Sequence, residues 1–326
     1  MFGLKAAVLA VVLEALIKVS KRALKSGFMV ALSIAAFIAI AFLKLPFPLI
    51  IAAAALCGAL LHLAGYWTAS DGQQAHSEPI YEMPEWTKPN ARRFFSTLAA
   101  WLAIWFLPLV LLHAVLGGGN VFTTEATFFS KMAAVTFGGA YAVLAYVAQQ
   151  AVEVHGWLKP DEMLTGLGLA ETTPGPLILV LVFVGFLGGA RLSGLAPLTG
   201  GLAGAAVTLW FTFVPCFLWI FVGAPYVETV RNVRWLASAL SAVTAAVVGI
   251  IANLALWFAL HVLFASVGET AVGPFILPVP DWPSFDMVAS AIAVAAGLAL
   301  IRFNANMILV LAAAALAGMV WRSTVF

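Results

Sequence analysis

Long apolar stretches alternate with short breaks along the whole chain, and the breaks contain polar residues, glycine or proline. A helix needs about 20 apolar residues to cross the hydrocarbon core of a bilayer, and most of these stretches approach or reach that length. The pattern therefore predicts an all-α polytopic membrane protein with about ten helical segments, some of them broken. The expected segments are 1–17, 28–44, 46–66, 94–116, 128–150, 164–190 (interrupted), 197–224, 237–267, 286–301 and 307–321.

The charge content excludes a water-soluble globular protein. Charged residues make up 9% of the 326 positions, whereas a soluble domain carries roughly 25%. A formal net charge of +2 gives no reason to expect nucleic acid as a partner. Cys57 and Cys216 lie singly in apolar stretches and are expected to be packing residues. No paired acids, Ser/His pair or His cluster has a spacing that would gather an active site, so we expect no enzyme, no metal and no other cofactor.

Basic residues indicate how the helices are oriented. Lys and Arg gather in the connections 18–25, 88–93 and 231–234, whereas the loop 268–285 has acidic residues and no basic ones. Because basic loops stay on the cytoplasmic side of a membrane, we expect the three basic connections inside the cell and 268–285 outside. The long polar stretch 67–93 is then a cytoplasmic linker.

The N-terminal and C-terminal helix pairs resemble each other at an offset of 260 residues. Residues 52–56 and 312–316 both read Ala-Ala-Ala-Ala-Leu, and each run lies in the second helix of a pair joined by a tight turn. The loops before the two copies differ in charge, as in the inverted-topology repeats of transporters; chance alignment of alanine-rich helices is the alternative. On the repeat hypothesis, 1–66 is the tail of a truncated first repeat, 67–93 is the linker and 94–326 is a complete second repeat.

Two segments differ from the others because glycine and proline interrupt them. Pro174-Gly175-Pro176 must break a helix, since proline removes an N–H donor and clashes with the preceding turn. The helix that follows offers unpaired N–H groups and a partial positive charge, which favour an anion. Gly138-Gly139 allows an equally close backbone approach, and non-helical backbone at membrane depth persists only when it is buried in protein or lines a polar cavity. The candidate anion-binding residues are Thr136, Phe137, Gly138, Gly139, Thr172, Thr173, Pro174, Gly175 and Pro176.

Each of these features also has a structural alternative. The alternative for 174–176 is an ordinary kink or a surface loop, and for 138–139 it is close helix packing. Glu171 is a candidate for proton coupling, because an acid inside an apolar segment is a functional candidate by default, and the alternative is a hydrogen-bonded structural acid. Lys131 and Arg191 are candidates for steering the anion, or they extend to the membrane interface.

Two further glycine patterns predict close contact between helices. Gly185-x-x-x-Gly189 and Gly200-x-x-x-Gly204 each place two small residues on one helical face. Such faces let two helix backbones approach within a membrane. We therefore expect these glycines to be packing positions and not binding residues.

The motifs resemble those of a known family. Thr136-Phe137-Gly138-Gly139, then Gly156-Trp157-Leu158, then the run 166–176 occur in an order that closely resembles the second half of the chromate ion transporters. Residues 210–263 are also similar to that family, and 1–66 resemble the end of its first half. The resemblance implies a multi-pass protein of the bacterial inner membrane that exports chromate, with long-chain members built from two homologous halves in opposite orientation.

The resemblance also implies partners: chromate or a similar oxyanion, the lipid bilayer, and either a second copy of the chain or a subunit that supplies the missing half. Residues 1–66 contain neither the Gly-Gly nor the Pro-Gly-Pro motif, and Thr165 stands where the family resemblance implies an acid. Three alternatives follow. The chain is a truncated membrane subunit that does not transport, one part of a two-subunit transporter, or a transporter of sulfate or another oxyanion.

Overall fold

The computed structural model describes residues 2–67, 90–136, 140–172, 177–226 and 233–325. Within these residues the chain is predominantly helical, and three helices are long and apolar enough to cross a membrane. The expected class of all-α polytopic membrane protein is thereby confirmed. The three helices are Ala91–Leu116, Pro197–Tyr226 and Arg234–Leu263.

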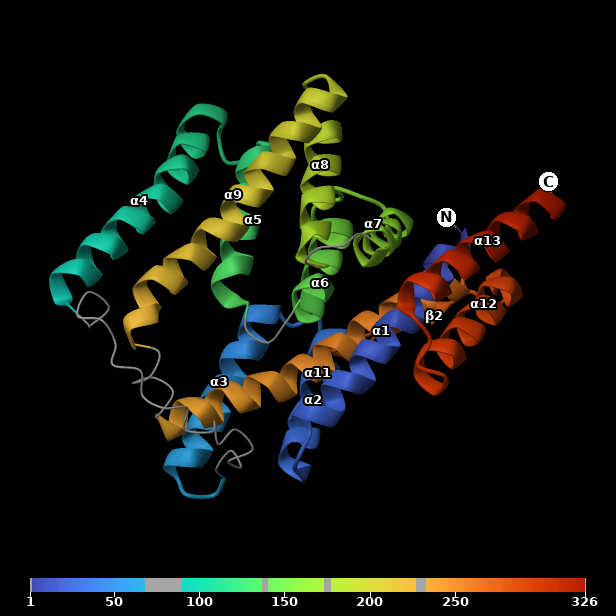
Figure 1. The fold of residues 1–326 in the computed structure, drawn as a ribbon, viewed down its shortest axis with the longest axis horizontal. Helices are drawn as coiled ribbons and strands as arrows, with labels where there is room; N and C mark the ends of the chain where they lie inside the picture. Colours follow the sequence, from blue (N-terminus) through green and yellow to red (C-terminus); the bar gives the residue numbers. More distant parts are fainter. Residues whose placement is uncertain (1, 68–89, 137–139, 173–176, 227–232, 326) are drawn as a thin grey trace.

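Figure 1 shows the course of the chain from the N-terminal to the C-terminal helices. The α-helices are α1 (Phe2–Ala23), α2 (Gly27–Ala41), α3 (Phe47–Leu63), α4 (Ala91–Leu116), α5 (Val121–Val135), α6 (Ala140–Gln149), α7 (Pro160–Thr172), α8 (Val180–Leu192), α9 (Pro197–Gly223), α11 (Arg234–Leu263), α12 (Met287–Gly297) and α13 (Met307–Val325). Short 3-10 or π turns are η2 (Gln150–Val154), η3 (Leu177–Leu179), η4 (Ala224–Tyr226), η5 (Trp282–Ser284) and η6 (Leu298–Arg302).

The helices form two groups. In the first, α1 and α11 pack against each other, α2 and α3 pack on α11, and α12 and α13 pack on α1. In the second, α9 packs against α4, α5 and α8. The remaining helices, α6 and α7, contact the first group: α6 packs against α11, and α7 packs against α1. Each terminal helix pair therefore packs on the long helix that precedes the other pair in the sequence.

The helix pairs at the two ends of the chain are joined by turns of the same conformation. Lys44 and Asn304, which are 260 residues apart, both adopt left-handed torsions, with φ of 50° and 48°. Such torsions are uncommon for residues other than glycine. The same backbone hydrogen bonds surround both: Leu43 N–H to Ile38 (3.3 Å) and Leu45 N–H to Ala39 (3.0 Å), and Phe303 N–H to Leu298 (3.3 Å) and Ala305 N–H to Ala299 (3.0 Å).

The boundaries of the expected segment 128–150 are wrong, because the structure has two helices in this region. The first, α5, already begins at Val121. There the side chain of Asn120 accepts a hydrogen bond of 2.9 Å from the N–H of Phe122 and caps the helix. Hydropathy missed this start because two threonines and a glutamate lower the apolar content of the first turns. Within the expected segment 164–190 the structure describes the separate helices α7 and α8, and the interruption expected between them lies outside the described residues.

The loop 268–285 contains strands that the sequence pattern did not predict. β1 (Val267–Val272) and β2 (Phe275–Pro280) form an antiparallel hairpin. The ammonium group of Lys44 lies 3.0 Å from a carboxylate oxygen of Glu269 in β1, so the turn between α2 and α3 contacts this hairpin. The hairpin and the turn between α2 and α3 therefore lie next to each other.

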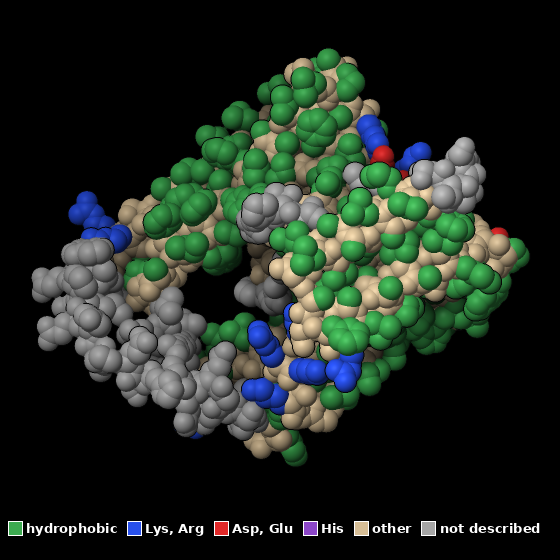
Figure 2. Space-filling model, turned by 45° about the vertical axis from the view of Figure 1, so that its right-hand side comes forward, with side chains coloured by type: hydrophobic (Ala, Val, Ile, Leu, Met, Phe, Trp, Pro, Cys, Tyr) green, Lys and Arg blue, Asp and Glu red, His purple; other side chains and the backbone are tan. Residues whose placement is uncertain are grey.

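One face of the molecule is largely hydrophobic, with Lys and Arg side chains in a few separate groups (Figure 2). At the C-terminal end of α1 and just beyond it, four basic side chains are exposed. An exposed apolar surface next to a local basic cluster suits a helical protein embedded in lipid. The four exposed basic residues are Lys18, Lys21, Arg22 and Lys25.

Candidate anion-binding site

The first candidate break lies between α5 and α6. Thr136 follows the last residue of α5 in an extended conformation, and α6 begins at Ala140. The Thr136 hydroxyl donates a hydrogen bond of 2.6 Å to the carbonyl of Met132, so its proton is engaged within its own helix. The other candidates in this motif, Phe137, Gly138 and Gly139, lie outside the described residues.

The second candidate break lies between α7 and α8. Glu171 and Thr172 are the last two residues of α7, and the described chain resumes with η3, which leads directly into α8. Thr173, Pro174, Gly175 and Pro176 lie outside the described residues. The break that the Pro-Gly-Pro motif predicts therefore stays a prediction.

The helix start that follows the second candidate break lies against the helix that follows the first. η3 contacts α6, and it also contacts α7 and α8 on either side of its own break. Figure 1 shows α6 close to the lower end of α8. The first N–H groups of a helix lack partners within the helix and carry a partial positive charge. A helix start beside α6 is a setting suited to an anion, and binding by the candidate residues stays a prediction.

The two basic candidates lie differently with respect to these breaks. Lys131 is exposed on the second half of α5. Arg191 lies near the far end of α8, about 18 Å along the helix axis from η3 at 1.5 Å per residue. Its guanidinium group donates two hydrogen bonds, of 2.6 and 2.8 Å, to the carboxylate of Glu162 in α7. The structure therefore does not bring Arg191 to the helix starts.

Arg191 and Glu162 shift each other's pKa. The hydrogen bond from Arg191 lowers the pKa of Glu162 from 4.5 to about 2, and this effect exceeds the opposing effect of burial. The same hydrogen bond raises the pKa of Arg191. Arg191 also lies 3.4 Å from the carbonyl of Trp157. This ion pair fixes α7 to α8 at the end remote from the Pro-Gly-Pro break.

Sequence reasoning missed Glu125, the most deeply buried acid among the described residues. Its side chain is 0% exposed, and neither carboxyl oxygen has a hydrogen-bond partner among the described residues. Helical spacing could have revealed it, because Val121, Phe122, Phe128 and Phe129 lie three or four positions away and are all buried. An acid among apolar residues on one helical face is a recognisable signal.

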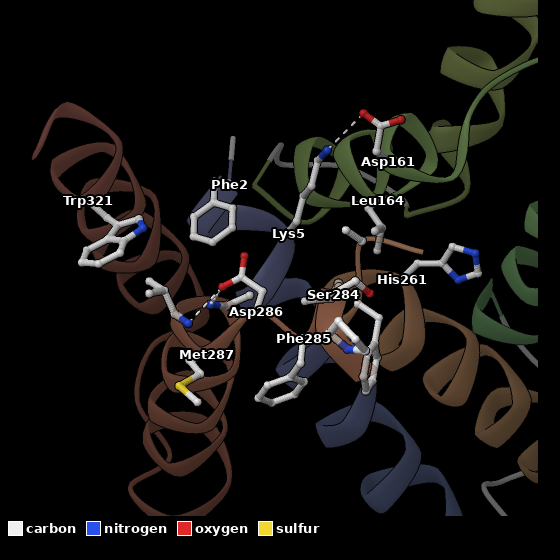
Figure 3. Close-up of a pocket in the computed structure, with 16 residues that line it drawn as sticks. Phe2, Lys5, Asp161, Leu164, His261, Ser284, Phe285, Asp286, Met287 and Trp321 are labelled. Carbon is white, nitrogen blue, oxygen red and sulfur yellow. Dashed lines mark hydrogen bonds and ion pairs between the residues drawn. The ribbon is translucent and has the colours of Figure 1, made fainter. Parts of the chain in front are cut away.

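A separate hollow of about 600 Å³ lies where α1, α7, α11 and α12 meet (Figure 3). Lys5 of α1 lies 3.3 Å from Asp161 of α7, and Asp286 accepts hydrogen bonds from the first N–H groups of α12. Among the described residues that line the hollow, none belongs to the predicted anion-binding set. Because Lys5 is already paired with an acid, this hollow has no surplus positive charge to favour a dianion.

Comparison with known proteins shows which family and which relatives this chain is similar to. Residues 124–319 match the chromate transporter family. A chromate transport protein of Cupriavidus metallidurans is 30% identical over 38% of this chain and 28% of its own length. A chromate transport protein of Pseudomonas aeruginosa is 32% identical over 47% and 34% of the two chains, and a probable chromate transport protein of Synechococcus elongatus is 29% identical over 45% and 35%. The chain thus spans about a third of the length of these curated relatives, and no solved structure matches it.

Proposed function

Because this chain belongs to the chromate transporter family, we propose that it exports chromate from the cytoplasm across the bacterial inner membrane. The family match covers more than half of the chain and includes both broken segments. Three helices that are long and apolar enough to cross a membrane support a multi-pass location. The exposed basic residues at the end of α1 support a cytoplasmic position for that end.

The anion is bound where the broken helices restart. The observation that supports this proposal is the contact between η3 and α6, since it places the helix start after the second motif against the helix that follows the first. Thr136 to Gly139 and Thr172 to Pro176 bind the tetrahedral dianion through backbone N–H groups and threonine hydroxyls. The Thr136 hydroxyl must turn away from the Met132 carbonyl to donate to the anion.

Membrane potential supplies a driving force for export. Moving one elementary charge through 100 mV is worth about 2.3 kcal/mol, so an outward-moving dianion gains roughly twice that amount from an inside-negative potential. A binding site for a doubly charged anion also suits sulfate, which has the same shape and charge. Chromate export therefore depends on potential, and sulfate competes for the same site.

Transport by everted membrane vesicles tests this function. Vesicles that contain the chain take up chromate when the interior is positive, and excess sulfate reduces this uptake. The Gly175→Leu variant fills the break with a bulky side chain and abolishes uptake. Gly223→Leu is the matched control, because a Cβ at Gly223 has no heavy atom within 4 Å and uptake is retained there.

The amount of each variant in the membrane is measured in the same vesicles. Absence of chromate and sulfate uptake by the inserted wild-type chain contradicts the proposal. Uptake by Gly175→Leu at the level of Gly223→Leu contradicts the location of the site. Uptake that appears only after co-expression of a second family member shows that the active transporter has two subunits.

A further inference from the structure

We propose that Glu125 is the proton-binding residue of this transporter, holding a proton while α5, α8 and α9 are packed together and releasing it when they separate. The role of Glu125 in coupling rests on the proposed transport function. Proton binding by Glu125 can be measured without transport. Glu125 lies in α5, outside both broken segments and remote in sequence from the acid candidate Glu171.

Glycines of two other helices form the surroundings of the Glu125 carboxyl group. A Cβ atom built at Gly188 of α8 would lie 2.5 Å from Glu125 Oε1, and one at Gly204 of α9 would lie 3.1 Å from Oε2. Any side chain at Gly188 would therefore displace the carboxyl group. The same Gly188 position borders the ring of Trp157, which is 1% exposed and helps to exclude water.

An ionised carboxylate cannot persist in these surroundings. Burying a charge without a partner costs so much free energy that the group is neutralised instead. Neither oxygen of Glu125 has a hydrogen-bond partner among the described residues. The nearby hydroxyl of Thr208, one helical turn beyond Gly204 on α9, is likewise buried without a partner. A proton on Glu125 removes the charge and turns the carboxyl group into a donor.

No basic side chain among the described residues forms a hydrogen bond with the Glu125 carboxyl group. α9 has no charged residue, and the one charged residue of α8, Arg191, is paired with Glu162. Lys131 of α5 is exposed, and His155, which stacks on Trp157, is kept neutral because burial lowers its pKa. The remaining ionisable groups on the packed helices are Arg92, Arg93 and His113 of α4, and Cys216 of α9.

Two helices, α5 and α8, connect the surroundings of Glu125 with the two candidate breaks. α5 extends from Glu125 to Thr136, and α8 with η3 extends from Gly188 to Leu177. Each distance is about 16 Å at 1.5 Å per residue. Glu125 therefore lies where the two helices that carry the breaks are held against α9. A change in the packing at Glu125 shifts both helix ends that bind the anion.

Proton release is a simple acid dissociation. When α5 separates from α8 and α9, water enters, the O–H bond of the carboxyl group breaks, and the proton passes to water. The carboxylate accepts a proton again before the helices close. Inward proton movement releases free energy under the inward-directed proton gradient, so it can assist outward movement of chromate.

Infrared spectroscopy of the purified full chain in lipid tests proton binding directly. At neutral pH the wild type shows the carbonyl stretching band of a protonated carboxyl group, and Glu125→Gln loses this band. Glu14→Gln is the matched control, because Glu14 is ion-paired with Lys18 on α1, and it retains the band. A spectrum of Glu125→Gln with the band intact overturns the proposal.

Everted vesicles with the membrane potential held at zero test the coupling. A pH gradient drives chromate movement in the wild type and in Glu14→Gln, and a dye reports the accompanying proton movement. In Glu125→Gln the pH-driven rate falls about tenfold, within the usual range of coupling between sites, while potential-driven uptake persists. Glu125→Asp retains an intermediate pH-driven rate, which shows that the acid itself is needed.

The two proposals fail in different ways. Potential-driven chromate uptake without any pH-driven component, or coupling that follows sodium, overturns the role of Glu125 and leaves chromate transport intact. Absence of all chromate uptake overturns the proposed function, and the infrared band then decides whether Glu125 binds a proton. If Glu125→Gln does not accumulate, the band of Glu125→Asp supplies the decision, because it shifts only if this residue carries the proton.

Discussion

Arg191 and Glu162 form an ion pair that joins two helices. The carboxylate accepts two hydrogen bonds from the guanidinium group, and the two side chains are 26% and 40% exposed. From the sequence, Arg191 is a candidate for steering an anion or for extension to the interface. The structure shows it joined to α7, and a role in steering stays a prediction.

The Glu162–Arg191 pair predicts a pH dependence of stability. Because the folded pKa of Glu162 is lowered from 4.5 to about 2, its contribution is fully present above about pH 4.5 and is lost as the pH falls toward 2. Glu162→Gln therefore lowers the thermal stability of the purified protein at pH 7. The expected loss is about 1 kcal/mol, since the pair is partly exposed to solvent.

Thermal unfolding in detergent at several pH values measures this effect. The difference between wild type and Glu162→Gln narrows below pH 4.5. Asp161→Asn is the control, because Asp161 is 62% exposed and its loss has a smaller effect. A constant difference between wild type and Glu162→Gln from pH 7 to pH 3 contradicts the prediction.

Helix packing between α8 and α9 depends on the glycine patterns that the sequence displays. A Cβ at Gly189 would collide with the Gly200 carbonyl, and one at Gly204 would collide with the Gly185 carbonyl. The predicted packing role of these four glycines is confirmed. The close approach of the two helices also creates the narrow space that encloses Glu125, so element packing and the proposed proton site share one cause.

Gly189 and Gly27 predict opposite outcomes for the same substitution. Gly189→Ala forces α8 and α9 apart and lowers stability by an amount on the order of 1–3 kcal/mol. Gly27→Ala introduces a Cβ that meets nothing within 4 Å, so stability is unchanged or rises by less than about 1 kcal/mol. The melting temperatures of the two purified variants test this difference. Equal effects of the two substitutions would show that the close packing at Gly189 does not contribute to stability.

At the scale of the whole molecule, the terminal helix pairs have related surroundings. Gly58 and Gly318 are 260 residues apart, and each lies at a close helix contact. Gly58 of α3 packs against Ser238 and Ala242 near the start of α11, and Gly318 of α13 packs against Gly3 near the start of α1. These contacts support the proposal that the pairs belong to repeats of opposite orientation, with α1 and α11 in equivalent positions.

Opposite orientation predicts that the two equivalent turns lie on opposite sides of the membrane. In a background of Cys57→Ala and Cys216→Ala, a membrane-impermeant thiol reagent labels Lys44→Cys in intact cells and Asn304→Cys in everted vesicles. Thr270→Cys serves as a marker for the outer side, since the loop 268–285 has acidic and no basic residues. Lys25→Cys marks the cytoplasmic side. Labelling of both turns from one side contradicts the inverted repeat.

The sequence by itself determined the features that depend on local chemistry. Apolar length required a membrane environment, and the glycine motif placed the end of α5 next to Thr136. The start of α5 was also encoded locally, in the capping residue Asn120, but the hydropathy pattern concealed it.

Only the tertiary structure decided which of these features meet. The contact between η3 and α6, the pairing of Arg191 with Glu162, and the enclosure of Glu125 by Gly188 and Gly204 all join residues far apart in the chain. Helix propensity and hydropathy act over one or two turns, whereas these contacts depend on how whole helices pack against one another. Burial of a single carboxyl group is therefore a property of three packed helices, and no local pattern specifies it.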